Sequence, residues 1–286
     1  MVKILLQLVK KSILLHALMA VGIGYMMSLP TLADFKWDVF GVALMGLGFV
    51  FSGSASLNHL QEMHYDMQMD RTSKRPLPSG NVSINFVGIF SLILIGFGMA
   101  MLMLVFPVTV WLLAASVVGL YNYVYTPLKR ITWLNTFVGA VPGALPVLCG
   151  WSLSGQPFSV LAFYLFGLYY FWQLPHFFAI AWMYKEPYQK AGFKMLSLTD
   201  DTGKKSAFYS MVLCVVLMAF VFIPYYLGFF HLPYLIIMGS ISLAFLYSCF
   251  QFVKESSIKK AKVVMIVSIV FSQLLFVSIV IDRLVS

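Results

Sequence analysis

Long apolar segments recur along the whole chain and are separated by polar connections. Each is close to the roughly 20 apolar residues that a helix needs to cross a lipid bilayer. The pattern therefore predicts an all-α, polytopic membrane protein with nine transmembrane helices, formed as one membrane-embedded domain over residues 1–286. The predicted helices lie at residues 12–30, 38–57, 82–105, 108–126, 135–153, 159–183, 206–228, 232–252 and 261–281.

Composition and charge agree with this pattern. Of the residues, 61% are hydrophobic and 10% are charged, whereas about a quarter of the residues of a soluble domain are charged. Only Lys36 and Arg283 fall outside the N-terminal segment and the connections after the second, fourth, sixth and eighth predicted helices, although the chain has 19 Lys and Arg. By the positive-inside rule, we expect an inner-membrane protein with its N-terminus and long connections in the cytoplasm and its C-terminus outside.

The net charge of +9 is thus explained by topology and by contact with anionic membrane lipid, and a nucleic-acid partner is excluded. The three cysteines, Cys149, Cys214 and Cys249, lie in apolar segments without the spacing of metal ligands. We interpret them as small buried hydrophobic residues. The chemistry of the chain must therefore come from its polar connections.

An acidic row begins the connection after the second predicted helix. Asn58, Glu62, Asp66 and Asp70 recur every four residues, which on a helix leaves neighbours roughly 40° apart around the axis and about 6 Å apart along it. Carboxylate and amide oxygens are ligands that suit Mg²⁺, which completes its shell with water and substrate phosphate. The row predicts a magnesium site at the membrane edge. Because Asn58 and Asp66 are about 12 Å apart in rise on a straight helix, too far to bind one ion together, we expect adjacent pairs of these residues or two ions.

Basic side chains follow the acidic row at Arg71, Lys74 and Arg75, where they would neutralise phosphate oxygens. Acidic and then basic residues in this order fit a magnesium diphosphate. The alternative is a solvated helix end whose charges pair at four-residue spacing. We favour the functional interpretation because Asn58 and Glu62 directly extend an apolar helix, where polar groups are costly.

A second segment runs from Tyr121 to Pro146 and contains Lys129 and Arg130. We expect these two cations on the same side of the membrane as the acidic row, where they would clamp the diphosphate. They are otherwise a positive-inside anchor followed by a packing face of small residues. The segment therefore predicts a second part of the diphosphate site.

A third segment runs from Phe171 to Lys205. His176 lies in an apolar helix, where an ionisable residue is a functional candidate, although a satisfied core histidine remains the alternative. Glu186, Asp200 and Asp201 follow in the connection. They predict a second and weaker metal site, or they are solvated.

These three segments resemble the UbiA-type intramembrane prenyltransferases and, within them, the haem O synthases. The resemblance extends from about Gly22 to beyond Ser206. Asn58 with acidic residues at four-residue spacing is the general pattern. More specific to the haem branch are Met69, Arg71-Thr72, Arg75-Pro76-Leu77, Tyr125-Thr126, Leu128-Lys129-Arg130, Asn135, Gly143-Ala144, Pro146, Gly150-Trp151, Trp172-Gln173, Pro175-His176-Phe177, Tyr188, Ala191-Gly192 and Met195-Leu196.

The resemblance implies nine helices around a central cavity, Mg²⁺ as cofactor, farnesyl diphosphate as donor and haem B as acceptor, with haem O as product. Two departures concern the second metal site: Glu186 stands where the family has Asp, and residues 197–205 are polar where it tends to be apolar. The expected metal ligands are Asn58, Glu62, Asp66, Asp70 and Asp200. The expected catalytic residues are Asn58, Glu62, Asp66, Arg71 and Lys129, and the expected substrate-binding residues are Lys74, Arg75, Tyr125, Arg130, Asn135, Trp172, His176, Glu186 and Tyr188.

Two other functions are compatible with parts of the sequence. An aromatic or quinone prenyltransferase would share the acidic row but would need no haem-positioning histidine. A transporter or a non-enzymatic haem-handling membrane protein would use buried polar residues as a substrate path, but it leaves the acidic row with Arg71 and Arg75 unexplained. A haem A synthase or a terminal oxidase assembly protein is a further possible partner.

Overall fold

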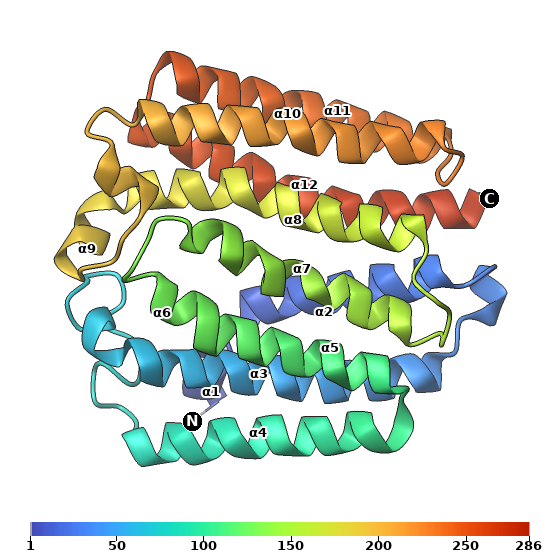
Figure 1. Cartoon of the computed structure of the whole chain (residues 1–286), viewed down its shortest axis with the longest axis horizontal. Coiled ribbons are helices and arrows are strands. Elements are labelled where there is room, and N and C mark those ends of the chain that lie inside the picture. Colours follow the sequence, from blue (N-terminus) through green and yellow to red (C-terminus); the bar gives the residue numbers. More distant parts are fainter. Residues whose placement is uncertain (1, 286) are drawn as a thin grey trace. The chain divides into compact units, whose positions relative to one another are not determined.

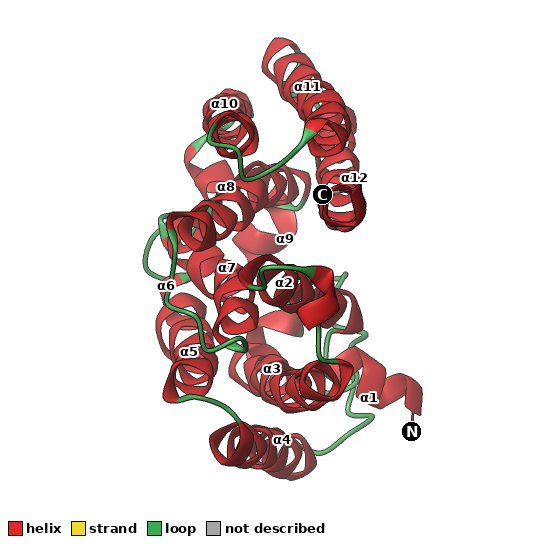
Figure 2. Ribbon diagram, turned by 90° about the vertical axis from the view of Figure 1, so that its right-hand side faces the viewer, coloured by secondary structure: helices red, strands yellow, loops and turns green. Residues whose placement is uncertain are grey.

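A computed structural model describes residues 2–285, which form helices and loops and contain no strand (Figures 1 and 2). The predicted all-α class is confirmed. The α-helices are α1 (Val2–Leu8), α2 (Lys11–Ser28), α3 (Trp37–Asp66), α4 (Ile84–Val105), α5 (Val108–Val118), α6 (Thr126–Leu128), α7 (Asn135–Ser152), α8 (Val160–Met183), α9 (Lys185–Lys190), α10 (Lys204–Tyr226), α11 (Leu232–Lys254) and α12 (Ile258–Val285). Two 3₁₀ turns, Leu32–Asp34 and Leu196–Thr199, and a π-helical segment, Gly119–Tyr125, complete the elements.

Within residues 2–285, the long helical segments agree closely with the nine that the sequence predicts. The helices α5 and α6 count as one segment because the π-helical turn joins them without a break. Seven of the segments are long and apolar enough to cross a membrane. The other two, α7 and α8, are rich in glycine, proline and aromatic residues, which lowers their hydropathy. The chain is an integral membrane protein.

The chain packs as two compact units, each described here by itself. Unit 1 comprises the residues up to Ser28, Lys36–Pro157 and Glu186–Lys194. Unit 2 comprises Leu29–Phe35, Phe158–Lys185 and the residues from Met195 onward. The single domain expected from the sequence stays a prediction.

In unit 1, small residues let helices approach closely. The helix α2 packs along α7, and α3 packs along α4 (Figure 1). A Cβ atom added to Gly24 of α2 would overlap the carbonyl oxygen of Val147, and one added to Gly150 of α7 would overlap that of Val21. Backbones in such contact gain dispersion energy, which drives helix association where lipid removes the hydrophobic contribution.

Unit 2 is built from α8, α10, α11 and α12, which pack side by side. The Asp282 carboxylate, buried near the end of α12, accepts hydrogen bonds from the backbone N–H groups of His231 (2.9 Å) and Tyr234 (3.4 Å). It thus caps the exposed N–H groups at the start of α11, a role usually filled by a residue of the same helix. The contact joins α11 to α12 at this end of unit 2.

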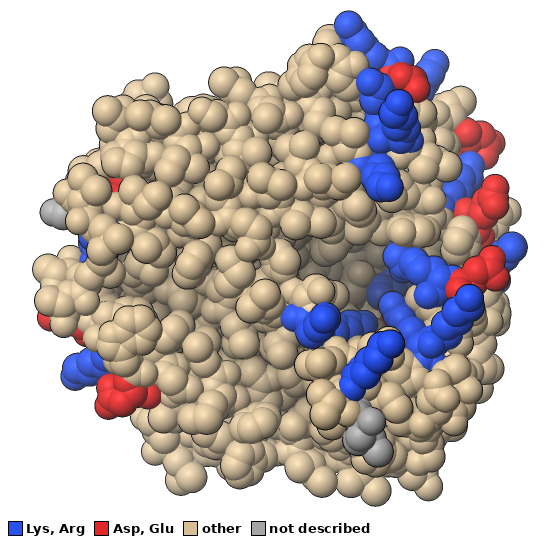
Figure 3. Space-filling view, turned by 180° about the vertical axis from the view of Figure 1, so that it is seen from behind, with Lys and Arg blue, Asp and Glu red and all other residues tan. Residues whose placement is uncertain are grey.

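Charged side chains gather at helix ends and leave the middle of the helices apolar. Figure 3 shows one face on which Lys and Arg cluster toward one end while a broad band carries no charge. The apolar band includes side chains that are exposed in the absence of lipid, such as Ile89, Leu92 and Leu104. This distribution fits helices that lie in a bilayer with their ends in the headgroup region.

Candidate active site

The last turns of α3 carry three side chains with oxygen atoms, an amide and two carboxylates, on one face. Asn58, Glu62 and Asp66 are 0%, 6% and 1% exposed, and their four-residue spacing stacks them along the helix. Sequence analysis placed the end of the apolar helix at residue 57, whereas α3 continues to Asp66. The acidic row is thus formed on a rigid helix, as its spacing predicts.

The prediction that Asp70 continues this row is wrong. The helix α3 ends at Asp66, where Thr72 Oγ1 donates a hydrogen bond to the Asp66 carbonyl at 2.9 Å. This bond satisfies a terminal carbonyl and turns the chain back. Asp70 lies in the following turns and is exposed, so the helical row has three members.

Glu62 is paired with Lys129, which directly follows α6. The Lys129 Nζ atom lies 2.6 Å from Glu62 Oε1 and 4.4 Å from the centre of the Tyr125 ring. Burial alone would lower the pKa of Lys129, but the adjacent Glu62 carboxylate outweighs it and raises this pKa well above the ordinary value of 10.5. Lys129 is therefore a permanent cation in the site.

Asp66 is paired with Arg75 from the turns after α3, whose Nη1 atom lies 2.6 Å from Asp66 Oδ2. The Asp66 side chain is 1% exposed, whereas 30% of the Arg75 side chain is exposed. A buried carboxylate is stable only when a cation or hydrogen-bond donors compensate its lost hydration. Arg75 gives this compensation and remains open to solvent on one side.

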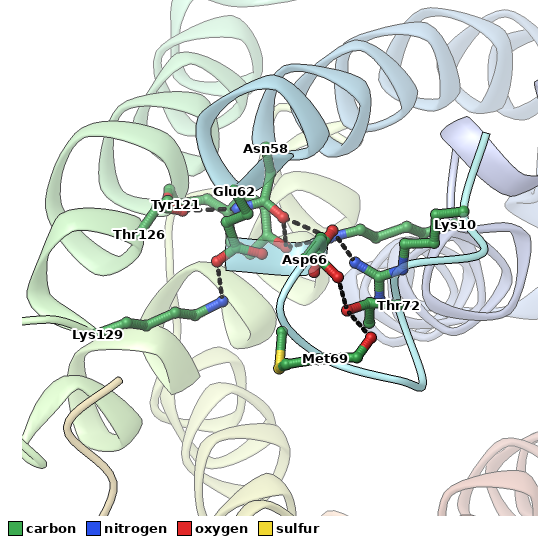
Figure 4. A network of polar contacts seen from close by, with 10 residues as sticks. Lys10, Asn58, Glu62, Asp66, Met69, Thr72, Tyr121, Thr126 and Lys129 are labelled. Atoms are coloured by element: carbon green, nitrogen blue, oxygen red, sulfur yellow. Dashed lines mark hydrogen bonds and ion pairs between the residues drawn. The ribbon is translucent and has the colours of Figure 1, made fainter. Parts of the chain in front are cut away.

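Asn58 is held by both ends of its amide group (Figure 4). Its Nδ2 atom donates to Thr126 Oγ1 at 2.8 Å, and its Oδ1 atom accepts a hydrogen bond from Lys10 Nζ. Tyr121 lies beside the same oxygen, with its hydroxyl 3.3 Å from Lys10 Nζ. Burial lowers the pKa of Lys10 to about 7.

The π-helical segment Gly119–Tyr125 explains how this wall of the site is formed. A π turn holds one more residue than an α turn and is frequent at functional sites. Thr126 N–H and Thr126 Oγ1 both bond to the carbonyl of Tyr121. The widened turn thereby places Thr126 and Tyr121 together next to Asn58.

Sequence analysis missed Lys10, Tyr121 and Thr126 as site residues. It interpreted Lys10 only as one of the charges that orient the chain in the membrane. Lys10 and Asn58 are 48 residues apart, and no local pattern connects them. The motif Tyr125-Thr126 was the only signal for Thr126, and it had no role attached.

In unit 1 each of these three side chains of α3 therefore has its own cation: Lys10 for Asn58, Lys129 for Glu62 and Arg75 for Asp66. We refer to these six residues as the paired row. In the part of the chain that the structure describes, no three His, Cys, Asp or Glu side chains gather to hold a metal by themselves. Two carboxylates and one amide nevertheless fit Mg²⁺, which commonly takes one or two carboxylates and fills its shell with phosphate and water.

The segment Glu186–Lys194 covers the same side of unit 1. Asn135 Nδ2 donates to the Lys194 carbonyl at 2.7 Å, and the Lys194 N–H donates to the Lys129 carbonyl at 2.6 Å. The Arg71 guanidinium lies 5.9 Å from the ring centre of Tyr188 in this segment. Asn135 and Lys129 thus bind the same residue, Lys194, and Arg71 lies beside Tyr188 of the same segment.

The remaining predicted residues of unit 1 lie further out. Arg130 is exposed and stacks on the Tyr65 ring at 4.5 Å from its centre. Lys74 and Glu186 are exposed. These three side chains can reach solvent and lie outside the paired row.

In unit 2, Ser268 of α12 binds two of the predicted residues of α8. Its hydroxyl lies 2.7 Å from His176 Nδ1, and its carbonyl accepts from Trp172 Nε1 at 2.6 Å. The rings of Trp172 and His176 stack with their centres 6.4 Å apart. The two side chains therefore form one fixed aromatic pair.

Asp200 is an N-terminal cap of α10. Its carboxylate accepts hydrogen bonds from Thr202 N and Oγ1, Lys205 N and Ser206 N. Burial alone would raise the pKa of Asp200, but these donors outweigh it and lower this pKa below the ordinary 3.8. Because the chain itself uses both carboxylate oxygens, Asp200 stabilises the start of α10. Its expected role as a metal ligand stays a prediction.

Comparison with known proteins identifies the family to which this chain is similar. The model of the UbiA prenyltransferase family matches residues 17–275. The protoheme IX farnesyltransferase of Solibacter usitatus is 33% identical over 97% of this chain and 98% of its own length. The mitochondrial protoheme IX farnesyltransferase of Arabidopsis thaliana is 34% identical over 79% of this chain and 52% of its own length. The resemblance predicted from the motifs is confirmed.

Solved structures share the fold at low sequence identity. A digeranylgeranylglyceryl phosphate synthase superposes with a TM-score of 0.81 at 18% identity, covering 100% of this chain and 99% of its own. A UbiA homologue from Archaeoglobus fulgidus bound to GPP and Mg²⁺ gives a TM-score of 0.68 at 16% identity, covering 97% of this chain and 99% of its own. The chain belongs to the UbiA prenyltransferase family.

Proposed function

We propose that the chain transfers the farnesyl group of farnesyl diphosphate to a vinyl group of haem B and thereby forms haem O and diphosphate. The observation that carries this proposal is the paired row of unit 1. Each of its three side chains that would bind a metal is paired with a cation that would bind a diphosphate. The names of the similar protoheme IX farnesyltransferases support the acceptor. The GPP and Mg²⁺ bound to the fold relative support the donor class and the cofactor.

The reaction breaks the allylic carbon–oxygen bond of the donor, and its electron pair leaves with the diphosphate. The vinyl group attacks the allylic carbon, water adds to the resulting carbocation beside the porphyrin ring, and this water loses a proton to give a hydroxyl group. Adjacent pairs among Asn58, Glu62 and Asp66 would hold Mg²⁺, as one ion or two, and the bound metal would supply positive charge that stabilises the departing diphosphate. Apolar and aromatic side chains exclude water from the allylic cation until the acceptor has reacted.

Lys129 and Arg75 stabilise the negative charge that develops on the diphosphate. Their side chains compensate Glu62 and Asp66, and both have long stems that can redirect the charged group over several ångströms. Arg75 is suited to a bidentate contact with phosphate oxygens. Arg71, beside Tyr188, extends the positive surface at the edge of the site, with the exposed Lys74 and Arg130 further out.

His176 and Trp172 position the haem in this proposal, with the Ser268 hydroxyl fixing the imidazole ring. Imidazole is a suitable ligand for iron, and a fixed partner at one ring nitrogen orients such a ligand. The substitution His176→Ala is expected to weaken haem retention and shift the haem absorption spectrum while farnesyl diphosphate binding is kept. An unchanged spectrum would remove His176 from the haem site.

The distribution of basic residues supports an orientation with the N-terminus and the paired row on the cytoplasmic side of the inner membrane and the C-terminus outside. The diphosphate head of farnesyl diphosphate is water-soluble, so a site that opens toward the cytoplasm allows this substrate to enter. The haem product is membrane-bound and fits transfer to a haem A synthase or an oxidase assembly protein in the same bilayer.

The test is incubation of the purified, detergent-solubilised protein with haem B, farnesyl diphosphate and Mg²⁺, followed by mass spectrometry of the extracted haem. The expected product has gained one farnesyl group and one water, and a metal chelator prevents its formation. A quinone precursor is offered in a parallel reaction. Prenylation of the quinone without modified haem would replace haem B by an aromatic acceptor, and failure of both reactions in folded protein would favour a non-enzymatic haem-handling protein.

A further inference from the structure

The junction between α1 and α2 has an unusual backbone conformation. Lys10 has φ of 50° and, among the described residues, is the only one other than glycine with positive φ. This left-handed conformation costs an ordinary L-residue about 1 kcal/mol or more. It separates α1 from α2 and points the Lys10 side chain at the end of α3, where Figure 4 shows it beside Asn58 and Tyr121.

The short helix α1 is anchored in unit 1 by its last residue. Leu8 is 0% exposed and packs in a cluster with Leu77 and Val87. Leu77 lies two residues beyond Arg75, which binds Asp66. The cluster therefore connects α1 to the turns that hold another cation of the paired row, and it fixes Lys10 and Arg75 relative to α3.

The charges of the paired row favour a bound anion. Three cations, Lys10, Arg75 and Lys129, face the two carboxylates of Glu62 and Asp66. Asn58 is neutral, so Lys10 does not compensate a carboxylate of its own. The hydrogen-bond partners of the Lys10 ammonium group, Asn58 and Tyr121, are both uncharged, and a diphosphate would supply the counter-charge that they lack.

We propose that Lys10 binds the diphosphate of the prenyl donor and that α1 is the strap that positions it. This inference rests on the proposed function for the identity of the donor. Lys10 Nζ bonds to Asn58 Oδ1, the oxygen proposed as a ligand of Mg²⁺. On donor binding Lys10 turns from this oxygen to the phosphate, so that the amide oxygen becomes available to the metal.

The test measures equilibrium binding of radiolabelled farnesyl diphosphate in the presence of Mg²⁺, without haem, and separately KM and kcat for haem O formation. Lys10→Met is expected to weaken donor binding about 10- to 100-fold, the range of one lost charge-assisted hydrogen bond. Lys10→Arg keeps the charge and is expected to restore most of the affinity. Lys10→Gln keeps a hydrogen-bond donor for Asn58 but lacks the charge, and it is expected to weaken binding of farnesyl diphosphate as Lys10→Met does. It takes the place of Lys10→Met in the series if the Met variant does not fold.

Lys11→Met is the matched control, because Lys11 is the exposed neighbour with the same charge. It is expected to bind the donor as the unmodified protein does. Leu8→Ala loosens the strap and is expected to weaken donor binding about threefold to tenfold. In the Lys10→Met background it is expected to add no further loss, because both changes act through the same contact between Lys10 and the donor. An additive effect would mean that Leu8 serves stability alone.

Equal donor binding by the Lys10→Met, Lys11→Met and unmodified proteins would overturn the inference and leave the proposed function intact. If the unmodified protein binds the donor but forms no haem O, the acceptor is wrong and the binding series still tests Lys10. If the folded protein does not bind the donor at all, both the proposed function and this inference fail.

Discussion

Residues 58–75 of unit 1, which hold four members of the paired row, resemble residues 200–205 of unit 2, the Asp200 segment, in sequence but differ from them in structure. Both come after an apolar helical run, and both place acidic residues before basic ones. In the paired row, Glu62 and Asp66 meet side-chain cations from other parts of the chain. Asp200 instead meets N–H groups of its own segment at the start of α10.

The two regions differ in whether the hydrogen-bond partner of the carboxylate can move away and be replaced by a metal ion. A lysine or arginine side chain can swing from a carboxylate to a phosphate and leave the carboxylate to a metal ion. A backbone N–H group at a helix start cannot move without unwinding the helix. Buried carboxylates paired with long cations are therefore prepared for a ligand, whereas a carboxylate bonded to its own backbone stabilises the fold.

The largest effect is expected at Asp66. Asp66→Asn removes the charge of a proposed metal ligand and the ion-pair partner of Arg75, so we predict that haem O formation falls about 100-fold or more. The control is Asp201→Asn, because the Asp201 side chain is 99% exposed. Steady-state assays with haem B and farnesyl diphosphate measure the activity of both variants. Full activity of Asp66→Asn would contradict the functional role given to the paired row.

Lys129 comes next. Lys129→Met leaves the buried Glu62 without its cation, which typically costs about 3 kcal/mol of stability, and it also slows turnover. Lys129→Arg keeps the charge and is expected to retain most of the stability. Both are measured by thermal unfolding in detergent and by haem O formation.

The effect of Lys129→Met is expected to be independent of pH between about pH 6 and pH 9. The pKa of Lys129 is raised, so its stabilising contribution is complete below the ordinary value of 10.5 and is lost only as the pH rises above its pKa in the folded protein. A destabilisation that disappears between pH 6 and pH 9 would contradict this assignment.

At Asp200 we predict a loss of stability without a specific loss of catalysis. Asp200→Ala removes the cap of α10 and should cost about 1 kcal/mol. The pKa of Asp200 is lowered, so its contribution is present above the ordinary value of 3.8 and is lost as the pH falls through the pKa of the folded state. Thermal unfolding of both proteins from neutral to acidic pH should show their difference shrinking. A loss of Mg²⁺ dependence per folded molecule would instead make Asp200 a metal ligand.

The smallest effect is expected at Gly139 of α7. A Cβ atom here would overlap the ring of Tyr125, which packs under Lys129. Gly139→Ala should displace this ring and raise KM for farnesyl diphosphate about threefold, a loss below 1 kcal/mol. Gly96→Ala in α4 is the control because nothing lies within 4 Å of its added Cβ. Equal KM values would show that Tyr125 does not position Lys129.

The sequence predicted what depends on local spacing. Apolar length located the long helices, and the four-residue spacing put Asn58, Glu62 and Asp66 on one face of α3. It failed at Asp70 because a single hydrogen bond from Thr72 helps to end the helix, and spacing does not reveal such a stop. It could not find Lys10, whose role depends on a left-handed residue and on a partner 48 positions away.

Determination of the structure with Mg²⁺ and a non-hydrolysable farnesyl diphosphate analogue tests the exchange of partners most directly. We predict that one or two metal ions contact oxygens of adjacent pairs among Asn58, Glu62 and Asp66, while Lys129 and Arg75 have left their carboxylates for the diphosphate. A metal diphosphate bound elsewhere, with the Lys129–Glu62 and Arg75–Asp66 pairs intact, would contradict the account.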